Sequence, residues 1–407
     1  MTRNEILKKI GLDVPAEARL RVLVDTDAKN EADDQFAIMH HLLTPLFDIR
    51  GIVATHFEQK DGYRGESMGK SYREVEKLLK LAQIDDVPYF RGCVSPLSSV
   101  SDAPVCEGVE QIIREARAPG KLYIAVQGAM TNVAAALNAA PEIAGNVVVL
   151  WNGGGPYPHG LEEFNVKQDP DAARAVLNSG AEIWQTPMNV YGTLEVTLAE
   201  LKRRVFPCGP LGAYLYRQLE AENHVEYSPG FLLRSGENWT LGDNTTIAVL
   251  IMNAWRGNWH MEPAPILKED LTYQANPSGR PIRVYDAIDV RMTLEDLFCK
   301  IELAYGEERC ADRGPADQSG KIRESEANDP CFLTEQDFLS SGILEDMLKQ
   351  NHIPYLKKDV MGAGMAIKVG PMLERSRFYV PSEHLSSAKA IMEDLFSAAE
   401  EADPDDP

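Results

Sequence analysis

The chain has 407 residues, of which 44% are apolar and 25% charged, and its formal net charge is −21. This composition is that of a globular protein, and the acidic excess argues against nucleic acid as a partner, because phosphate neutralisation requires stripes of Lys and Arg. No run reaches the roughly 18 apolar residues of a membrane-spanning helix, and the N-terminus is too polar for a signal peptide. The six cysteines form no CxxC pair, so we expect a cytoplasmic protein without a membrane partner, a zinc site or a disulfide framework.

Short apolar runs alternate with amphipathic stretches through the first three quarters of the chain. Apolar runs of this length between helices are typical of strands that are buried on both faces. The alternation predicts an α/β fold with a mainly parallel open sheet flanked by helices. We expect strands at 21–27, 48–57, 121–128, 147–155 and 181–190, and helices at 32–43, 67–83, 130–143 and 170–179.

Polar loops follow four of the expected strands. They contain "DTDAKNEADD", "THFEQKDG", "QGAMTN" and "NGGGPYPHG". Ligands of parallel sheets bind beyond the carboxyl ends of the strands. We therefore expect these four loops to meet at one edge of the sheet, although they are distant in sequence.

The alternation stops at 307–328, a polar segment with Gly, Pro and Ser that is typical of a linker. After it, a strand, a helix, short strands (one at 366–370) and a final helix predict a ferredoxin-like α+β domain. The stretches "NHIPYLKKD" and "YVPSEHL" resemble a small prokaryotic family described as signal-transducing proteins. The expected organisation is a domain at 1–306, a linker at 307–328, a small domain at 329–398 and an acidic tail at 399–407.

The segment "DTDAKNEADD", residues 25–34, places four aspartates directly after an apolar run. Crowded carboxylates repel one another unless a cation lies among them. An EF-hand is excluded, because Asn30 and Phe36 stand where its loop needs Gly and Glu. A phosphatase of the haloacid dehalogenase type also begins with a strand and DxD, but Lys29 stands where that class needs a small hydroxyl or β-branched residue.

Two other interpretations of the same segment stay open. A helix cap accounts for Asp33 or Asp34 at the start of the next helix, but not for Asp25 and Asp27 at the end of the strand. A site for a hard cation such as Ca²⁺ would account for all four carboxylates, because those at the strand end and at the helix start could share one ion.

At this point the sequence resembles the inosine-uridine preferring nucleoside hydrolase family, whose hallmark is an apolar strand followed by DTDPGxDD. Here "VDTDAKNEADD" keeps DTD and DD but is two residues longer between them. "VQGAMTNVAAAL", "LWNGGG", "EEFNVKQDPDAARAVL" and "LGDNTTIAVLI" resemble further family blocks in the same order. The resemblance covers about 20–300.

The resemblance implies a calcium site and a ribose site. Asp27, Asp34, Asp243 and the main-chain carbonyl of Gln127 would ligate Ca²⁺, and Asp27 would also take a proton from a water on the ion. Asp33, Glu163 and Asn165 would bind the ribose, with Asn30 beside them, and Asp25 would support the ligands from behind.

The departures from the family concern the side that faces the leaving base. The family's His before the metal-binding Asp is Gly242 here, and its LDVTH block is "MNVYG" at 188–192. His56 is therefore the leading candidate to assist the leaving group, followed by Tyr157 and His159 on the glycine-rich loop. Trp239 is a candidate to stack on the aglycone.

These observations predict a calcium-dependent hydrolase that cleaves the N-glycosidic bond of a ribonucleoside and releases ribose and a base. We expect a nucleoside as the small-molecule partner and a homodimer or homotetramer as the assembly. One alternative is a hydrolase of another ribosyl or glycosyl substrate on the same scaffold. A second alternative is a non-catalytic sensor of nucleoside or ribose.

Overall fold

The computed structural model of the protein describes residues 1–225, 236–253, 258–306, 330–360 and 375–400. The chain forms two compact units, Met1–Ala311 and Asp312–Pro407. Within the described ranges, no helix combines the length and the apolar character needed to cross a membrane.

A central sheet organises the first unit. Its strands are β1 (Leu20–Thr26), β2 (Phe47–Ala54), β3 (Tyr89–Arg91), β4 (Leu122–Val126), β5 (Val147–Asn152), β6 (Glu182–Thr186), β9 (Trp259–Pro263) and β12 (Pro281–Tyr285). They lie in the order β3-β2-β1-β4-β5-β6-β12-β9. All neighbours run parallel except β9, which is antiparallel to β12. The mainly parallel sheet predicted from the sequence is confirmed.

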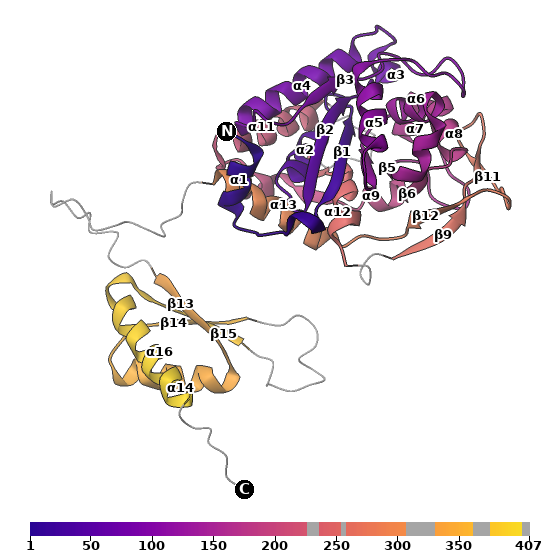
Figure 1. The fold of residues 1–407 in the computed structure, drawn as a ribbon. Helices are drawn as coiled ribbons and strands as arrows, with labels where there is room; N and C mark the ends of the chain where they lie inside the picture. Colours follow the sequence, from indigo (N-terminus) through magenta and orange to yellow (C-terminus); the bar gives the residue numbers. More distant parts are fainter. Residues whose placement is uncertain (226–235, 254–257, 307–329, 361–374, 401–407) are drawn as a thin grey trace. The chain divides into compact units, whose positions relative to one another are not determined.

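Helices cover both faces of this sheet (Figure 1). Successive side chains of β1 point to opposite faces of the sheet, and both faces are apolar: Val22 and Val24 belong to one apolar core and Leu23 to the other. The first face carries α2 (Asp34–Leu42), α4 (Ser67–Ala82), α11 (Gly209–Val225), α12 (Thr245–Ile251) and α13 (Val290–Tyr305). The second face carries α5 (Glu107–Arg117), α6 (Thr131–Ala139) and α8 (Pro170–Leu177).

Shorter elements complete the first unit. They are α1 (Arg3–Ile10), η1 (Ala16–Ala18), α3 (Glu58–Asp61), η2 (Pro141–Asn146), α7 (Phe164–Gln168), α9 (Met188–Tyr191), β7 (Glu195–Thr197), α10 (Leu198–Arg204), β8 (Asn238–Thr240), η3 (Gly242–Asn244), β10 (Ile266–Leu267) and β11 (Tyr273–Gln274). Two antiparallel pairs form, β7 with β8 and β10 with β11. The strand expected at 181–190 ends at Thr186, because Pro187 has no N–H for the ladder.

The buried side chain of Arg3 fastens α1 to the segment that follows α2. Its Nε donates to the carbonyl of Leu42 at 2.7 Å, Nη1 to Phe47 at 2.8 Å and Nη2 to Thr44 at 2.7 Å. Carbonyls at a helix end lack partners within the helix, and bonds from a charged donor are stronger than neutral ones. The C-terminal end of α2 is therefore firmly held. Asp34 is the first residue of the same helix.

The second unit is an α+β structure. Its strands β13 (Pro330–Asp337), β14 (Leu356–Val360) and β15 (Arg375–Pro381) form an antiparallel sheet in the order β13-β15-β14. Helices α14 (Phe338–Gln350) and α16 (Leu385–Glu400) join it, with η5 (Ser382–His384) between β15 and α16. The ferredoxin-like arrangement and the signal-transducing resemblance stay predictions. The linker expected at 307–328, the strand at 366–370 and residues 401–407 of the acidic tail lie outside the described residues.

A chain that ends at Glu308 should fold and keep its cation site. The expectation follows because α13 packs Leu297, Phe298 and Ile301 into the first core, and all candidate site residues precede it. Far-UV circular dichroism, thermal unfolding and calcium calorimetry check this against the full chain. An insoluble product, or one that loses calcium binding, would show that the domain boundary is wrong.

Candidate functional site

Strand β1 and helix α2 bring the four aspartates together through a tight turn. The amides of Lys29 and Asn30 donate to the carbonyl of Asp27 at 2.5 and 2.8 Å, which turns the chain directly after the strand. The hydroxyl of Thr26 donates to Asp34 Oδ1 at 2.5 Å. The end of the strand is thus tied to the first turn of the helix.

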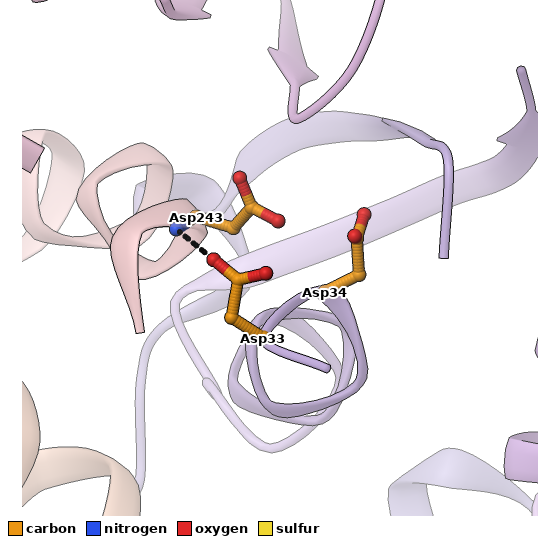
Figure 2. Close-up of side chains that lie close together, drawn as sticks. All are labelled: Asp33, Asp34 and Asp243. Carbon is orange, nitrogen blue, oxygen red and sulfur yellow. Dashed lines mark hydrogen bonds between the residues drawn. The ribbon is translucent and has the colours of Figure 1, made fainter. Parts of the chain in front are cut away.

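A distant element completes the cluster. Asp33 is the N-cap residue of α2, but its side chain makes no capping hydrogen bond. Its Oδ2 instead accepts from the amide of Asp243 in η3 at 3.3 Å (Figure 2). One oxygen of each of Asp33, Asp34 and Asp243 lies within 4.8 Å of the other two. A helix cap therefore does not explain Asp33.

Asp27 does not belong to this group of three but is buried close to it, near enough to act electrostatically on Asp34 and Asp243. Its side chain is 0% exposed, and neither carboxylate oxygen has a hydrogen-bond partner among the described residues; Asp34 Oδ2 is likewise without one. Gly128 permits the close approach of the loop after β4, since a Cβ there would lie 2.7 Å from Asp27 Cγ. Burial raises the pKa of Asp27, Asp34 and Asp243 well above the usual range, and repulsion among the carboxylates raises each pKa further. Buried carboxylates without partners are unfavourable, so the cluster requires a cation or protons.

A hard divalent cation fits these residues. The orphaned oxygens of Asp27 and Asp34 are the observation that supports it, because carboxylate oxygens are the ligands such ions prefer. The sequence-based ligand set was Asp27, Asp34, Asp243 and the Gln127 carbonyl. The structure also brings Asp33 next to Asp34 and Asp243.

Neutral side chains support the cluster from two sides. Asn152, at the end of β5, donates to Asp243 Oδ1 at 2.8 Å. Asn132 of α6 donates to Asp25 Oδ2 at 2.9 Å. Burial raises the pKa of Asp25 to about 8. Asp25 does not line the cavity beside the cluster; its side chain bonds to Asn132 of α6 instead.

That cavity has a volume of about 370 Å³. The candidate residues on its wall are Asn30, Asp33, Gln127, Glu163, Asn165 and Asp243. The loops after β1, β4 and β5 therefore meet at one edge, as expected from the sequence. The "THFEQKDG" loop contributes no described lining residue, although Lys60 in it donates to the carbonyl of Asn30 at 2.6 Å.

The side chain of Glu163 is fixed by four donors. It accepts from the amides of Gly154 at 2.9 Å, Asn165 at 3.1 Å and Val166 at 3.1 Å, and from the hydroxyl of Tyr191 at 2.8 Å. Burial raises its pKa in spite of these bonds. Asn165 in turn donates to the carbonyls of Gln127 at 3.2 Å and Asn152 at 2.9 Å. The "EFN" block therefore presents a rigid pair of polar side chains to the cavity.

His56 is not among the described residues that line this cavity. Thr131 donates its hydroxyl proton to Asp169 at 2.7 Å, so His56 Nε2, at 2.8 Å from the same hydroxyl, is the donor to it. The amide of Glu58 donates to His56 Nδ1 at 3.4 Å. Nε2 thus links His56 to α6 and, through Thr131, to Asp169 at the start of α8, whereas Nδ1 accepts from the first residue of α3. Burial lowers the pKa of His56 to about 4.

The other base-side candidates also lie off the described lining. Trp239 is 4% exposed and packs into the first core from β8. Tyr157 packs against Tyr273 with ring centroids 5.0 Å apart. His159 is exposed, and its carbonyl accepts from the Tyr273 amide at 2.7 Å.

The cavity includes residues that the sequence had not indicated. Tyr191 and Glu195 lie within and just after the "MNVYG" block, and Glu31 lies inside the aspartate segment. Asn152 ends the apolar strand in "LWNGGG", where a polar residue was a visible but unused signal. Tyr191 had no such signal, because its neighbours Glu163 and Gly242 are far away in sequence.

A carboxylate cluster beside a polar cavity, at the carboxyl edge of a mainly parallel sheet, defines an α/β enzyme for a small polar molecule. The chain belongs to the inosine-uridine preferring nucleoside hydrolase family, whose sequence profile matches residues 22–315. The enzyme class predicted from the sequence, an N-glycosyl hydrolase, is thereby confirmed.

Named relatives agree with this assignment. The chain is 26% identical over 241 residues to the pyrimidine-specific ribonucleoside hydrolase RihA of Salmonella arizonae, covering 52% of this chain and 75% of that one. It is 27% identical over 263 residues to the Escherichia coli protein of the same name, covering 57% and 79%. A purine-preferring ribonucleoside hydrolase from Gardnerella vaginalis has the same fold, with a TM-score of 0.59, 22% identity and coverage of 70% of this chain and 99% of that one.

Replacing His56 by Gln should reduce the loss of stability in acid. A histidine whose pKa is lowered from 6.5 to about 4 by folding favours the folded state above pH 6.5, and this contribution disappears as the pH falls towards 4. Between these pH values the parent should lose up to about 3 kcal/mol more unfolding free energy than the variant. Urea unfolding at several pH values measures it, with the exposed His159→Gln as control. Parallel pH profiles of parent and His56→Gln would contradict the buried neutral state.

Proposed function

We propose that this enzyme hydrolyses the N-glycosidic bond of a ribonucleoside in a calcium-dependent reaction that releases ribose and a base. The observation that carries the proposal is the orphaned, buried carboxylates of Asp27 and Asp34 beside a polar cavity. The names of the relatives, ribonucleoside hydrolases, support ribonucleosides as the substrate class. The homo-oligomer and the cytoplasmic location stay predictions.

The acidic character of the cavity suits this chemistry. The glycosidic bond opens through an oxocarbenium-like state, in which the sugar gains positive charge. In the proposal, Asp33, Glu163 and Asn165 hold the ribose hydroxyls, and the carboxylates stabilise the developing charge. The place of Glu163 on the cavity wall supports this role, and its donors fix the orientation of its carboxylate.

Asp27 is the proposed general base. It takes the proton of the attacking water, and its two unpartnered oxygens in the described structure support that role. A base must be ionised, whereas burial raises the pKa of Asp27. Positive charge beside a carboxylate lowers its pKa. When bound by Asp27, Asp34, Asp243 and the Gln127 carbonyl, with Asp33 close by, Ca²⁺ would supply that charge and acidify water.

Calorimetric titration of chelator-treated protein should show one Ca²⁺ bound per chain. Asp34→Asn should weaken the binding at least about tenfold, because it removes a charged oxygen ligand without changing the shape of the side chain. Asp13→Asn, at an exposed site, is the matched control. Absence of calcium binding, or equal affinity in the Asp34 variant and the parent, would exclude the proposed site.

Asp27→Asn should lower kcat on a ribonucleoside by about 100-fold or more while the fold is kept, because it removes the proton acceptor but keeps the shape. Steady-state rates and thermal unfolding are measured together, again with Asp13→Asn as control. Turnover within about tenfold of the parent would rule out Asp27 as the base.

A further inference from the structure

The described wall of the cavity is acidic and aromatic. None of its described lining residues is Lys, Arg or His. Asp33 and Asp243 belong to the carboxylate cluster, Glu163 is held by its donors, and Glu162 pairs with Lys167. Glu31, in the loop before α2, and Glu195, in β7, add negative charge from two further elements.

The ring of Tyr191 occupies the space that a side chain at position 242 would need. A Cβ built on Gly242 would lie 3.0 Å from Tyr191 Cδ2 and 3.6 Å from Asp33 Oδ2. Tyr191 therefore forms an aromatic wall next to the carboxylate cluster. Its hydroxyl proton is committed to Glu163 at 2.8 Å, so Tyr191 has no proton free for a departing base.

The described residues place no histidine in the cavity to take this role. His56 donates to Thr131, and His159, in the loop after β5, is exposed and does not line the cavity. Glu195 lies on the wall of the cavity and is exposed to solvent. A neutral nucleobase needs protonation or equivalent stabilisation as its bond opens. The described wall instead has the character that attracts positive charge, namely carboxylates and the face of an aromatic ring.

We infer that the preferred substrate is an N-riboside whose aglycone is an aromatic cation, such as a ribosylated pyridinium or an N7-alkylated purine. The inference rests on the proposed function, because it names the substrate class of the same site. Glu195 attracts the cationic ring electrostatically, and Tyr191 presents an aromatic face to it. The carboxylates that hold the sugar act on the ribose half, as for any nucleoside.

Such an aglycone leaves without an acid. The oxygen of water bonds to C1′ of the ribose as the C1′–N bond breaks. The electron pair of that bond passes to the ring nitrogen and cancels its positive charge, so the aglycone departs neutral. The proton of the water goes to Asp27 and then to solvent. The products are ribose, a neutral aglycone and one proton.

Three kinds of substrate separate this inference from the proposed function. The full chain with Ca²⁺ is assayed on 7-methylinosine (cationic), inosine (neutral) and 4-nitrophenyl riboside (neutral with a good leaving group). We expect kcat/KM for 7-methylinosine to exceed that for inosine at least about 100-fold, the contribution that a general acid makes to such a reaction, and also to exceed that for the nitrophenyl riboside. If kcat/KM for inosine or for the nitrophenyl riboside equals or exceeds that for 7-methylinosine, the inference is wrong, but the proposed function still holds. Hydrolysis of none of the three overturns both.

A charge variant tests recognition directly. Glu195→Gln should lower kcat/KM for 7-methylinosine about threefold more than for the nitrophenyl riboside, the effect of one exposed charge. Glu17→Gln, at an exposed position in η1, is the matched control. Equal effects of Glu195→Gln on both substrates would contradict a role in cation recognition.

A second variant tests the wall. Tyr191→Thr combined with Gly242→His makes room for a donor beside the cluster, and should raise the ratio of inosine to 7-methylinosine turnover. Gly242→His alone should not, because the Tyr191 ring blocks the space. If the combined variant folds and the ratio of inosine to 7-methylinosine turnover is unchanged, the function assigned to Tyr191 is wrong. If the combined variant does not fold, the effect of Glu195→Gln on the two substrates decides.

Discussion

The rest of the site depends on one unfavourable arrangement, the removal of several carboxylates from water at the same place. Repulsion between like charges strengthens as the dielectric constant falls, and Asp27 and Asp34 are completely buried. Neutral donors moderate the repulsion, since Thr26, Asn132 and Asn152 each donate to one carboxylate oxygen of the group. None of these donors cancels charge. The arrangement requires positive charge, either protons on the carboxylates or a cation, and in the proposal a cation supplies it.

The fold was largely predictable from sequence because its signals are local. Apolar runs such as β5 are buried along their whole length, and only a strand covered on both faces tolerates such a run. The strands β3, β9 and β12 of the same sheet were not predicted. In β9, Trp259, Met261 and Pro263 are exposed, so this edge strand has no continuous apolar run that would mark it. The end of β6 at Pro187 follows from backbone chemistry that was visible in the sequence.

The residues of the carboxylate cluster and the "EFN" block could be located from the sequence, whereas the opposite wall of the cavity could not. Asp27, Asp33, Asp34 and the "EFN" block belong to contiguous motifs, so the sequence itself marks them as candidates. The position of His56 after a strand does not tell to which side its ring turns; in the structure it bonds to Thr131 of α6. The contact between Tyr191 and Gly242 joins elements that no periodicity relates, and it appears only when the chain is folded.

Helix α2 is held by hydrogen bonds at both of its ends, so its contacts at one end restrict the position of the residues at the other. Its first turn holds Asp34 in the carboxylate cluster, while the carbonyls at and beyond its last turn are gripped by the Arg3 guanidinium. Because Arg3 holds the C-terminal end of α2, the N-terminal end with Asp34 is also hindered from moving along the helix axis. The contacts of α1 with the end of α2 thus bear on how firmly the carboxylates hold their positions. In the proposed cation site, residues of α1 would therefore influence which ionic radius the carboxylates accommodate, without contacting the ion.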